Sequence, residues 1–416
     1  MMKYILIIGD GMADNPVDAL GGKTPLETAR IPHIDALAAG GTVGSVLTVP
    51  RGLPPGSDTA ILSIFGADPR VCFTGRSPLE AAAGGISLEA GDVSYRCNMV
   101  TLEDGDMAFE DRRILSHSGG SIEGAESIRL AEDLFSHPEF GPAAEKAGIR
   151  VYPSPSFRHI AVQKGADIQG LVATPPHDVL DQPIGPNLPR GCDNAETLLA
   201  LMKLAHRVLD RHPINEERRR AGKLPANGIW FWAEGTAVAL DSFPKKYGKA
   251  GLVVSAVPLV QGIARLTGLD ITLVEGATGE LDTNYEGKTE AAVTALRDGY
   301  DFTAVHVEAP DECTHNGDTE GKIKAIEYLD GRVVAPLVQK LKGEGFDYRI
   351  LLLSDHKTLT STRGHDGDPV PFLLYESSRE TGRGLPYTEK AGENGPFVKE
   401  GTRLMEILFG TGEGKL

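Results

Sequence analysis

Apolar runs and amphipathic segments alternate along much of this chain, and their order predicts strands followed by helices. Residues 3–9 (KYILIIG) are continuously apolar, which predicts a strand buried on both faces. Strands alternating with helices are typical of a parallel sheet covered by helices on both sides. Further strands are predicted at 251–256, 270–276, 302–308, 348–354 and 371–375, and helices near 257–267, 288–298 and 319–342.

Two helices are predicted nearer the N-terminus. Residues 26–39 carry helical periodicity that Pro32 interrupts. A second helix is predicted over 58–66, directly after the sequence PPGS, with Ser57 as its N-cap.

The middle of the chain has a different character. Residues 77–240 hold many clusters of glycine, proline and polar residues, while apolar strands lie on both sides of the segment. A chain of 416 residues is long enough for two domains. We therefore expect a discontinuous α/β domain of residues 1–76 and 241–416, and an inserted α+β domain of residues 77–240.

Composition and charge narrow the class of protein. The formal net charge of −16 argues against general binding of nucleic acid, although local arginines or metal ions can still hold a small anion. The four cysteines are scattered without a CxxC pair, as in a cytoplasmic protein. No apolar run reaches 18 residues, and the N-terminal run ends at Asp10, so we expect neither a membrane span nor a signal peptide.

Acidic and histidine residues follow three of the predicted strands. In a parallel sheet, ligands bind at the carboxyl ends of the strands, so these side chains are expected to meet there. A single aspartate after a strand is more often a helix cap, but the set favours a site for divalent metal ions, since carboxylate and imidazole suit Mn, Zn or Fe. The candidate ligands are Asp10, Asp311, His315, Asp355, His356 and His365.

Ser57 is the candidate nucleophile. Pro54 and Pro55 stiffen the segment before it, and the helix that follows offers backbone amides and the positive end of its dipole. Alone, Ser57 would be an ordinary cap, but beside two metal ions it predicts transfer of a phosphoryl group.

Three segments resemble nucleotide- or phosphate-binding loops without matching them. The sequence GDGMAD lacks the third glycine of a dinucleotide loop, and GGKT at 21–24 is preceded by Val17 where a phosphate loop needs glycine. The GLPPGSDTA segment has only a faint likeness to the phosphate loop of small-molecule kinases, and the basic run at 217–223 is typical of a solvated helix face. No nucleotide site is predicted.

Several longer segments together resemble the alkaline phosphatase superfamily. They are GDGMAD, PPGSDTAILSIFG, EAPDECTH, LLLSDHKT and TRGHDGDPVPF. With GRSPLEAAAGGI, YRCNMVTL and GKIKAIEYLDGRVVAPL, the chain resembles nearly end to end the 2,3-bisphosphoglycerate-independent phosphoglycerate mutases of the archaeal type. The resemblance implies a three-layer α/β/α sandwich with a mostly parallel sheet and a smaller inserted domain.

The resemblance also implies roles for individual residues. Asp311, His315 and His365 would hold one metal ion, and Asp10, Asp355, His356 and the Ser57 oxygen the other. Mn²⁺ is the expected ion, with Mg²⁺, Zn²⁺ or Co²⁺ as alternatives, and Lys288 would neutralise the phosphoryl group. Substrate would be held in the inserted domain by Arg96, Asn98, Arg158, His159, His177 and Asp178.

The implied reaction is the interconversion of 3-phosphoglycerate and 2-phosphoglycerate through phosphoserine at Ser57, without 2,3-bisphosphoglycerate. A homoserine kinase-like phosphotransferase of the same subfamily is the alternative, and a non-catalytic metal-binding regulator is a third. The expected partner is the small phosphoglycerate substrate, not nucleic acid or membrane. The oligomeric state stays open, a homo-oligomer included.

Overall fold

The computed structural model describes residues 2–379 and 382–411. The chain forms two compact units. Unit 1 consists of Met1–Phe73 and Ala239–Leu416, and unit 2 is Thr74–Val238. The sequence predicted domain boundaries between residues 76 and 77 and between residues 240 and 241, within three residues of these units. The functions expected of the two domains stay predictions.

Unit 1 is built on an eight-stranded sheet in which β14 alone runs against its neighbours, as far as the described residues show. The α/β class with a mostly parallel sheet is thereby confirmed. Its strands, in spatial order, are β15 (Phe397–Val398), β2 (Thr42–Val46), β14 (Val370–Glu376), β11 (Asp347–Leu353), β1 (Met2–Gly9), β10 (Phe302–Val307), β8 (Gly251–Val254) and β9 (Asp270–Thr272).

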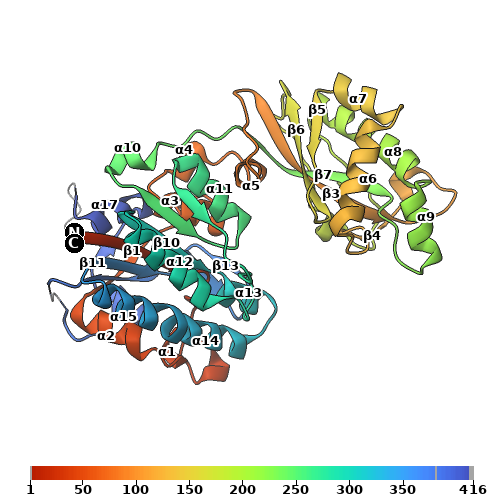
Figure 1. The fold of residues 1–416 in the computed structure, drawn as a ribbon. Helices are drawn as coiled ribbons and strands as arrows, with labels where there is room; N and C mark the ends of the chain where they lie inside the picture. The colour runs from red at the N-terminus through yellow and green to blue at the C-terminus, as the bar shows by residue number, and fades with distance from the viewer. Residues whose placement is uncertain (1, 380–381, 412–416) are drawn as a thin grey trace. The chain divides into compact units, whose positions relative to one another are not determined.

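Helices cover both faces of this sheet (Figure 1). The apolar side chains of β1, β10 and β11 are buried because neither face of the central strands reaches water. On one face lie α1 (Pro25–Thr28), α2 (Pro32–Gly40), α12 (Tyr285–Arg297), α14 (Thr319–Tyr328) and α15 (Ala335–Gly343); on the other lie α3 (Ser57–Ile64), α4 (Pro69–Cys72), α10 (Phe243–Tyr247), α11 (Pro258–Thr267) and α17 (Leu404–Phe409).

The structure refines several of the predicted elements. Pro32 does divide its segment, because α1 ends at Thr28 and α2 begins at Pro32. The helix predicted over 319–342 is interrupted by a π-helical stretch, Leu329–Val334. The strand expected over 270–276 ends at Thr272.

The placement of Ser57 is a correction. Ser57 is the first residue of α3 and Gly56 is its N-cap, so no side chain caps this helix. The Ser57 hydroxyl is thereby left available for other contacts.

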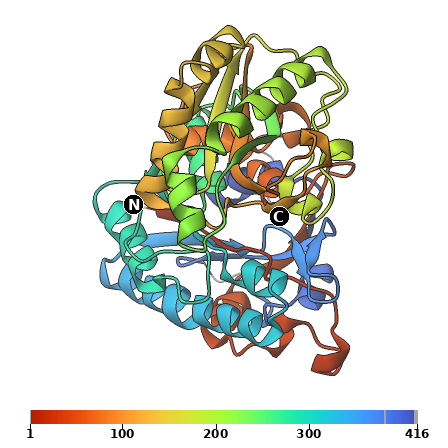
Figure 2. The ribbon, with the colours of Figure 1, turned by 90° about the vertical axis from the view of Figure 1, so that its right-hand side faces the viewer.

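Unit 2 is a five-stranded antiparallel sheet whose long strand β3 (Asp92–Leu102) pairs with three neighbours. The helices α6, α7 and α8 pack on the sheet in both views (Figures 1 and 2). The other elements are β4 (Ile114–Ser116), β5 (Ile149–Tyr152), β6 (Arg158–Lys164), β7 (Gly228–Thr236), α5 (Ser77–Ala83), α6 (Gly124–Ser136), α7 (Phe140–Lys146), α8 (Asp193–Leu209) and α9 (Pro213–Arg220).

Strand alternation divides the side chains of β3 between the two faces of this sheet. Val93, Tyr95, Cys97 and Met99 belong to the apolar core of unit 2. The intervening residues include Arg96, whose face is covered by α5 through an ion pair with Glu80. Within residues 2–379 and 382–411, no helix has the length and apolar character needed to cross a membrane.

A buried ion pair lies beneath the carboxyl ends of the strands in unit 1. Lys322 on α14 is 0% exposed, and its Nζ donates to Asp14 Oδ2 at 2.9 Å and to the Thr358 carbonyl at 2.6 Å. The backbone and hydroxyl of Thr360 also donate to the Asp14 carboxylate. These contacts connect α14 to the loop after β1 and to the short strand β12 (Lys357–Leu359).

Replacing Lys322 by methionine should lower the free energy of unfolding by about 3 kcal/mol, because the Asp14 carboxylate would stay buried without its cation. Urea unfolding followed by circular dichroism measures the change. Lys340→Met is the matched control, since the Lys340–Glu290 pair is exposed and should contribute less than about 1 kcal/mol. Equal losses in the two variants would contradict the argument.

Candidate active site

Three adjacent parallel strands, β11, β1 and β10, end at the same edge of the unit 1 sheet. Asp10 directly follows β1, and Asp355 and His356 follow β11. After β10, the short helix α13 (Ala309–His315) carries Asp311 and His315 on successive turns. The sheet thus brings Asp10 together with side chains that lie about 300 residues or more further along the chain.

The first group of candidate ligands is Asp311, His315 and His365, the last from the short strand β13 (Gly364–Asp366). Their ligand atoms all lie within 4.8 Å of one another. The Nε2 atoms of His315 and His365 are 2.9 Å apart, and Asp311 lies 3.1 Å from the first and 3.4 Å from the second.

The second group is Asp10, Asp355 and His356, which also lie within 4.8 Å and are fully buried. Asp355 Oδ1 accepts from the backbone of Gly11 and His356, while Asp355 Oδ2 has no hydrogen-bond partner. Asp10 Oδ1 likewise has none. These two oxygens lie 3.3 and 3.5 Å from His356 Nε2. The groups adjoin, since the rings of His356 and His365 are 4.2 Å apart.

Backbone carbonyls determine which nitrogen of each ring carries the proton. His315 Nδ1 donates to the Arg363 carbonyl at 2.8 Å, and His356 Nδ1 donates to the Lys357 carbonyl at 3.2 Å. In the neutral His356 ring, the Nε2 lone pair therefore faces carboxylate oxygens, whereas the hydrogen bond with Asp311 raises the pKa of His315 to about 9, so that without a cation its Nε2 holds a proton. Acceptors that face one another repel unless a cation lies among them.

Burial and the charge of Asp355 raise the pKa of Asp10 well above its usual range. Such crowding of buried carboxylates is the environment that a divalent cation stabilises. The donor set and the two unpartnered oxygens therefore fit divalent metal ions.

The remaining oxygen of Asp10 is held by a histidine that sequence analysis did not single out. His306 Nε2 is 2.9 Å from Asp10 Oδ2, and its Nδ1 is 3.1 Å from the Ser255 hydroxyl. Burial lowers the pKa of His306 to about 3, so the ring is neutral and donates one proton to the carboxylate. One oxygen of Asp10 is thus fixed while the other stays available to a ligand.

Ser57 lies beside the second group. Its Oγ is 3.2 Å from His356 Nε2 and 3.4 Å from Asp10 Oδ2. Lys288 is 1% exposed, and its Nζ donates to the His306 carbonyl at 3.0 Å. Burial lowers the pKa of Lys288 to about 8, and its expected role toward a phosphoryl group stays a prediction.

In unit 2, two arginines gather around Trp232 of β7. The guanidinium carbon of Arg96 is 4.6 Å from the centroid of the indole ring, and that of Arg158 is 5.7 Å away. The indole Nε1 donates to Asn98 Oδ1 at 2.9 Å, and the His177 ring lies 5.2 Å from Trp232. We call these five residues the arginine–tryptophan cluster.

Arg158 has unused capacity to bind an anion. Its Nε is buried without a hydrogen-bond partner. Burial, followed by the charge of Arg96, lowers the pKa of Arg158 to about 10. Glu80 already pairs with Arg96, so Arg158 is the guanidinium of the two with a donor left for another anion.

The structure does not bring His159 to this cluster. His159 pairs with Cys97 across the sheet and so faces the apolar core, where it is 0% exposed. Its Nδ1 accepts from the Ser154 backbone at 3.0 Å. Asp178 neighbours His177, with an oxygen 3.7 Å from the His177 Nε2, and is largely exposed.

Comparison with known proteins identifies the family. The family profile described as 2,3-bisphosphoglycerate-independent phosphoglycerate mutase matches residues 38–215. A protein of Geobacter sulfurreducens described as a probable member is 45% identical over 415 residues, covering 98% of this chain and 100% of that protein. A mutase of Methanothrix thermoacetophila is 44% identical over 409 residues, with 98% and 100% covered.

The chain belongs to this mutase family. It is therefore an enzyme of the isomerase class. Solved structures of two similar proteins have the same fold over nearly the whole chain. A Pyrococcus horikoshii protein of 30% identity superposes with a TM-score of 0.78 and 100% of both chains covered. A cofactor-independent phosphoglycerate mutase of Thermoplasma acidophilum, 27% identical, gives 0.65 with 99% of both covered.

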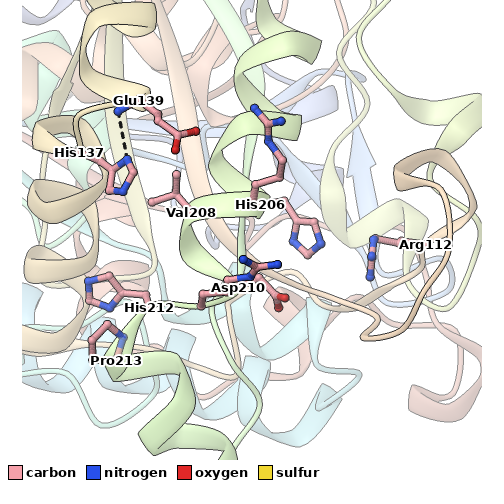
Figure 3. A pocket seen from close by; sticks show the side chains of 10 residues that line it. Arg112, His137, Glu139, His206, Val208, Asp210, His212 and Pro213 are labelled. Carbon is pink, nitrogen blue, oxygen red and sulfur yellow. Dashed lines mark hydrogen bonds between the residues drawn. The ribbon is translucent and has the colours of Figure 1, made fainter.

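A hollow of unit 2, of about 580 Å³, is lined by histidines and arginines near the end of α8 (Figure 3). Its histidines have structural partners. His137 accepts from the Glu139 backbone, His206 Nδ1 is 2.8 Å from the Asn227 carbonyl, and His212 contacts both the Ile214 backbone and Asp133. We assign this hollow no part in the mutase reaction.

The crowding of acceptor atoms in the second group predicts how replacing Asp10 changes thermal stability, which can be measured without substrate. In excess EDTA, Asp10→Asn should raise the thermal midpoint by roughly 3 °C, corresponding to about 1 kcal/mol, because it removes one buried charge. The Asn amide can also donate to His356 Nε2. In excess Mn²⁺ the order should reverse, since the wild type alone gains the full energy of cation binding.

Asp14→Asn is the control, because Asp14 is equally buried but paired with Lys322. It should lower the midpoint in both conditions. Differential scanning calorimetry measures all three proteins. A variant Asp10→Asn that is less stable than the wild type in EDTA would contradict the predicted crowding.

Proposed function

We propose that this enzyme interconverts 3-phosphoglycerate and 2-phosphoglycerate through a phosphoserine at Ser57, a reaction of glycolysis and gluconeogenesis. The observation that carries the proposal is the position of the Ser57 hydroxyl beside two adjoining groups of metal-ligand side chains. Membership of the mutase family supports the substrate.

Two divalent ions would be held by the two groups described above, with the Ser57 oxygen as a further ligand of the second. Mn²⁺ suits this mixture of carboxylate and imidazole, with Mg²⁺, Zn²⁺ or Co²⁺ as the alternatives. When bound, such ions lower the pKa of a nearby hydroxyl and offset the charge of a transferring phosphoryl group.

Ser57 would act as the nucleophile. Its oxygen would lose its proton and attack the phosphorus of 3-phosphoglycerate, the bond from phosphorus to the glycerate oxygen would break, and that oxygen would take up a proton. The phosphoserine is then attacked by the 2-hydroxyl of the same glycerate, which restores Ser57 and yields 2-phosphoglycerate. Because the phosphoryl group returns to the molecule that supplied it, no 2,3-bisphosphoglycerate is needed. Lys288 would contribute positive charge near the group in transfer.

The arginine–tryptophan cluster would hold the glycerate carboxylate. Guanidinium groups bind carboxylates through two parallel hydrogen bonds, and Arg158 has a buried donor without a partner. The guanidinium carbons of both arginines lie within cation–π range of the Trp232 ring. We include Arg96, Asn98, Arg158 and His177 in this proposed site, with Asp178 at its edge, and leave out His159 because it faces the core.

Ser57→Ala should lower mutase turnover by ~10³-fold or more while Mn²⁺ binding persists, because the remaining ligands are unchanged. Ser63→Ala is the matched control: Ser63 is on the same helix, and its buried hydroxyl has no hydrogen-bond partner. Acid quenching of the wild type with 3-phosphoglycerate, followed by peptide mass spectrometry, should locate phosphoserine at residue 57. Turnover by Ser57→Ala within tenfold of the wild type would exclude the scheme.

Arg158→Met should raise the KM for 3-phosphoglycerate about 10- to 100-fold, the loss expected for one charge-assisted hydrogen-bond pair. Its Mn²⁺ affinity should not change, because Arg158 is not one of the candidate ligands. Arg150→Met, on the neighbouring strand β5 and exposed, should leave KM unaltered. Steady-state kinetics decide between these outcomes, and an unchanged KM for Arg158→Met would remove Arg158 from the substrate site.

A further inference from the structure

One threonine hydroxyl joins the two groups of candidate ligands. Thr358 lies on β12 and is 0% exposed. Its Oγ1 is 2.5 Å from Asp311 Oδ1 in the first group and 3.2 Å from His356 Nδ1 in the second. No part in metal binding was expected of Thr358 from the sequence.

The direction of both hydrogen bonds follows from their partners. An ionised carboxylate only accepts, so the Thr358 hydroxyl donates its one proton to Asp311. His356 Nδ1 carries a proton, because it also lies 3.2 Å from the Lys357 carbonyl. The Thr358 oxygen therefore shares this proton with the Lys357 carbonyl as a second acceptor, and the Nε2 lone pair of His356 is left toward the second group.

The surrounding backbone holds this hydroxyl in place. The Thr358 amide donates to the Ala13 carbonyl at 3.1 Å, and the Thr358 carbonyl accepts from buried Lys322. Gly11, at a φ of +60°, leaves the necessary space, since a Cβ there would lie 2.3 Å from Thr358 Oγ1. These contacts hold the Thr358 side chain in one position.

We propose that Thr358 is a positioning residue that couples the two metal groups, orienting a carboxylate in one and fixing the ring of a histidine in the other. This inference rests on the metal binding proposed above. Partners of this kind typically change metal affinity 10- to 100-fold when removed. Because one hydroxyl serves both groups, its loss should weaken both sites together.

The test is a Mn²⁺ titration of the metal-stripped, full-length protein, with free Mn²⁺ followed by electron paramagnetic resonance. Thr358→Val removes the hydroxyl at nearly constant volume, and Thr358→Ser retains it. Thr303→Val is the matched control, because Thr303 is equally buried on β10 and its hydroxyl has no hydrogen-bond partner. Circular dichroism melts in EDTA establish that each variant is folded.

Thr358→Val should bind both Mn²⁺ ions 10- to 100-fold more weakly, with Thr358→Ser within about threefold of the wild type and Thr303→Val unchanged. Wild-type affinity in Thr358→Val would overturn the inference, as would a Thr358→Ser variant that binds as weakly as Thr358→Val. Weaker Mn²⁺ binding at only one of the two sites would overturn the proposed coupling between them. A wild-type protein that binds no Mn²⁺ would instead refute the proposed metal centre, so the two failures are distinguishable.

Discussion

Mutual repulsion of buried acceptors at the ends of three parallel strands is the constraint on which the rest of unit 1 depends. Asp10 and Asp355 each have one oxygen held by N–H donors and one without a partner, and both unpartnered oxygens face the His356 lone pair. A folded chain tolerates this arrangement only if the surrounding packing supports it. The architecture supplies that support through the rigid central strands and the buried Lys322–Asp14 pair.

The hydrogen bonds around the ligands form a consistent pattern. Carbonyls fix the tautomers of His315 and His356, His306 holds one oxygen of Asp10, and Thr358 connects Asp311 with His356. Each bond leaves one lone pair directed into the site. This preorganisation fits the proposed transfer, because groups already oriented need not reorganise as charge develops.

Much of this arrangement was predictable from the sequence, for a physical reason. Continuous apolar runs identify central strands, and in a parallel sheet their carboxyl ends lie at one edge, so Asp10, Asp311 and Asp355 were expected to meet there. The short strands β2 and β15 were not predicted, and the strand predicted over 270–276 is only the three residues of β9, because two to five residues carry little periodicity. The roles assigned to the ligands and to Ser57 stay predictions.

The residues that hold the candidate ligands in place were harder to predict from the sequence. His306 lies inside an apolar strand, and Thr358 lies two residues after a ligand, so only the folded chain shows what each contacts. His159 illustrates the opposite error: it adjoins Arg158 in sequence, but strand alternation turns it into the core. Had β6 been predicted as a strand, the alternation of its side chains would have placed Arg158 and His159 on opposite faces of the sheet.

The central claim is that this chain alone, with divalent cations, moves a phosphoryl group between two hydroxyls of one glycerate. Phosphorus NMR of the purified protein with 3-phosphoglycerate and Mn²⁺, without 2,3-bisphosphoglycerate, tests it directly. We expect 2-phosphoglycerate to appear until the two isomers reach equilibrium, with little inorganic phosphate. Release of inorganic phosphate without isomerisation, or conversion only after 2,3-bisphosphoglycerate is added, would contradict the account.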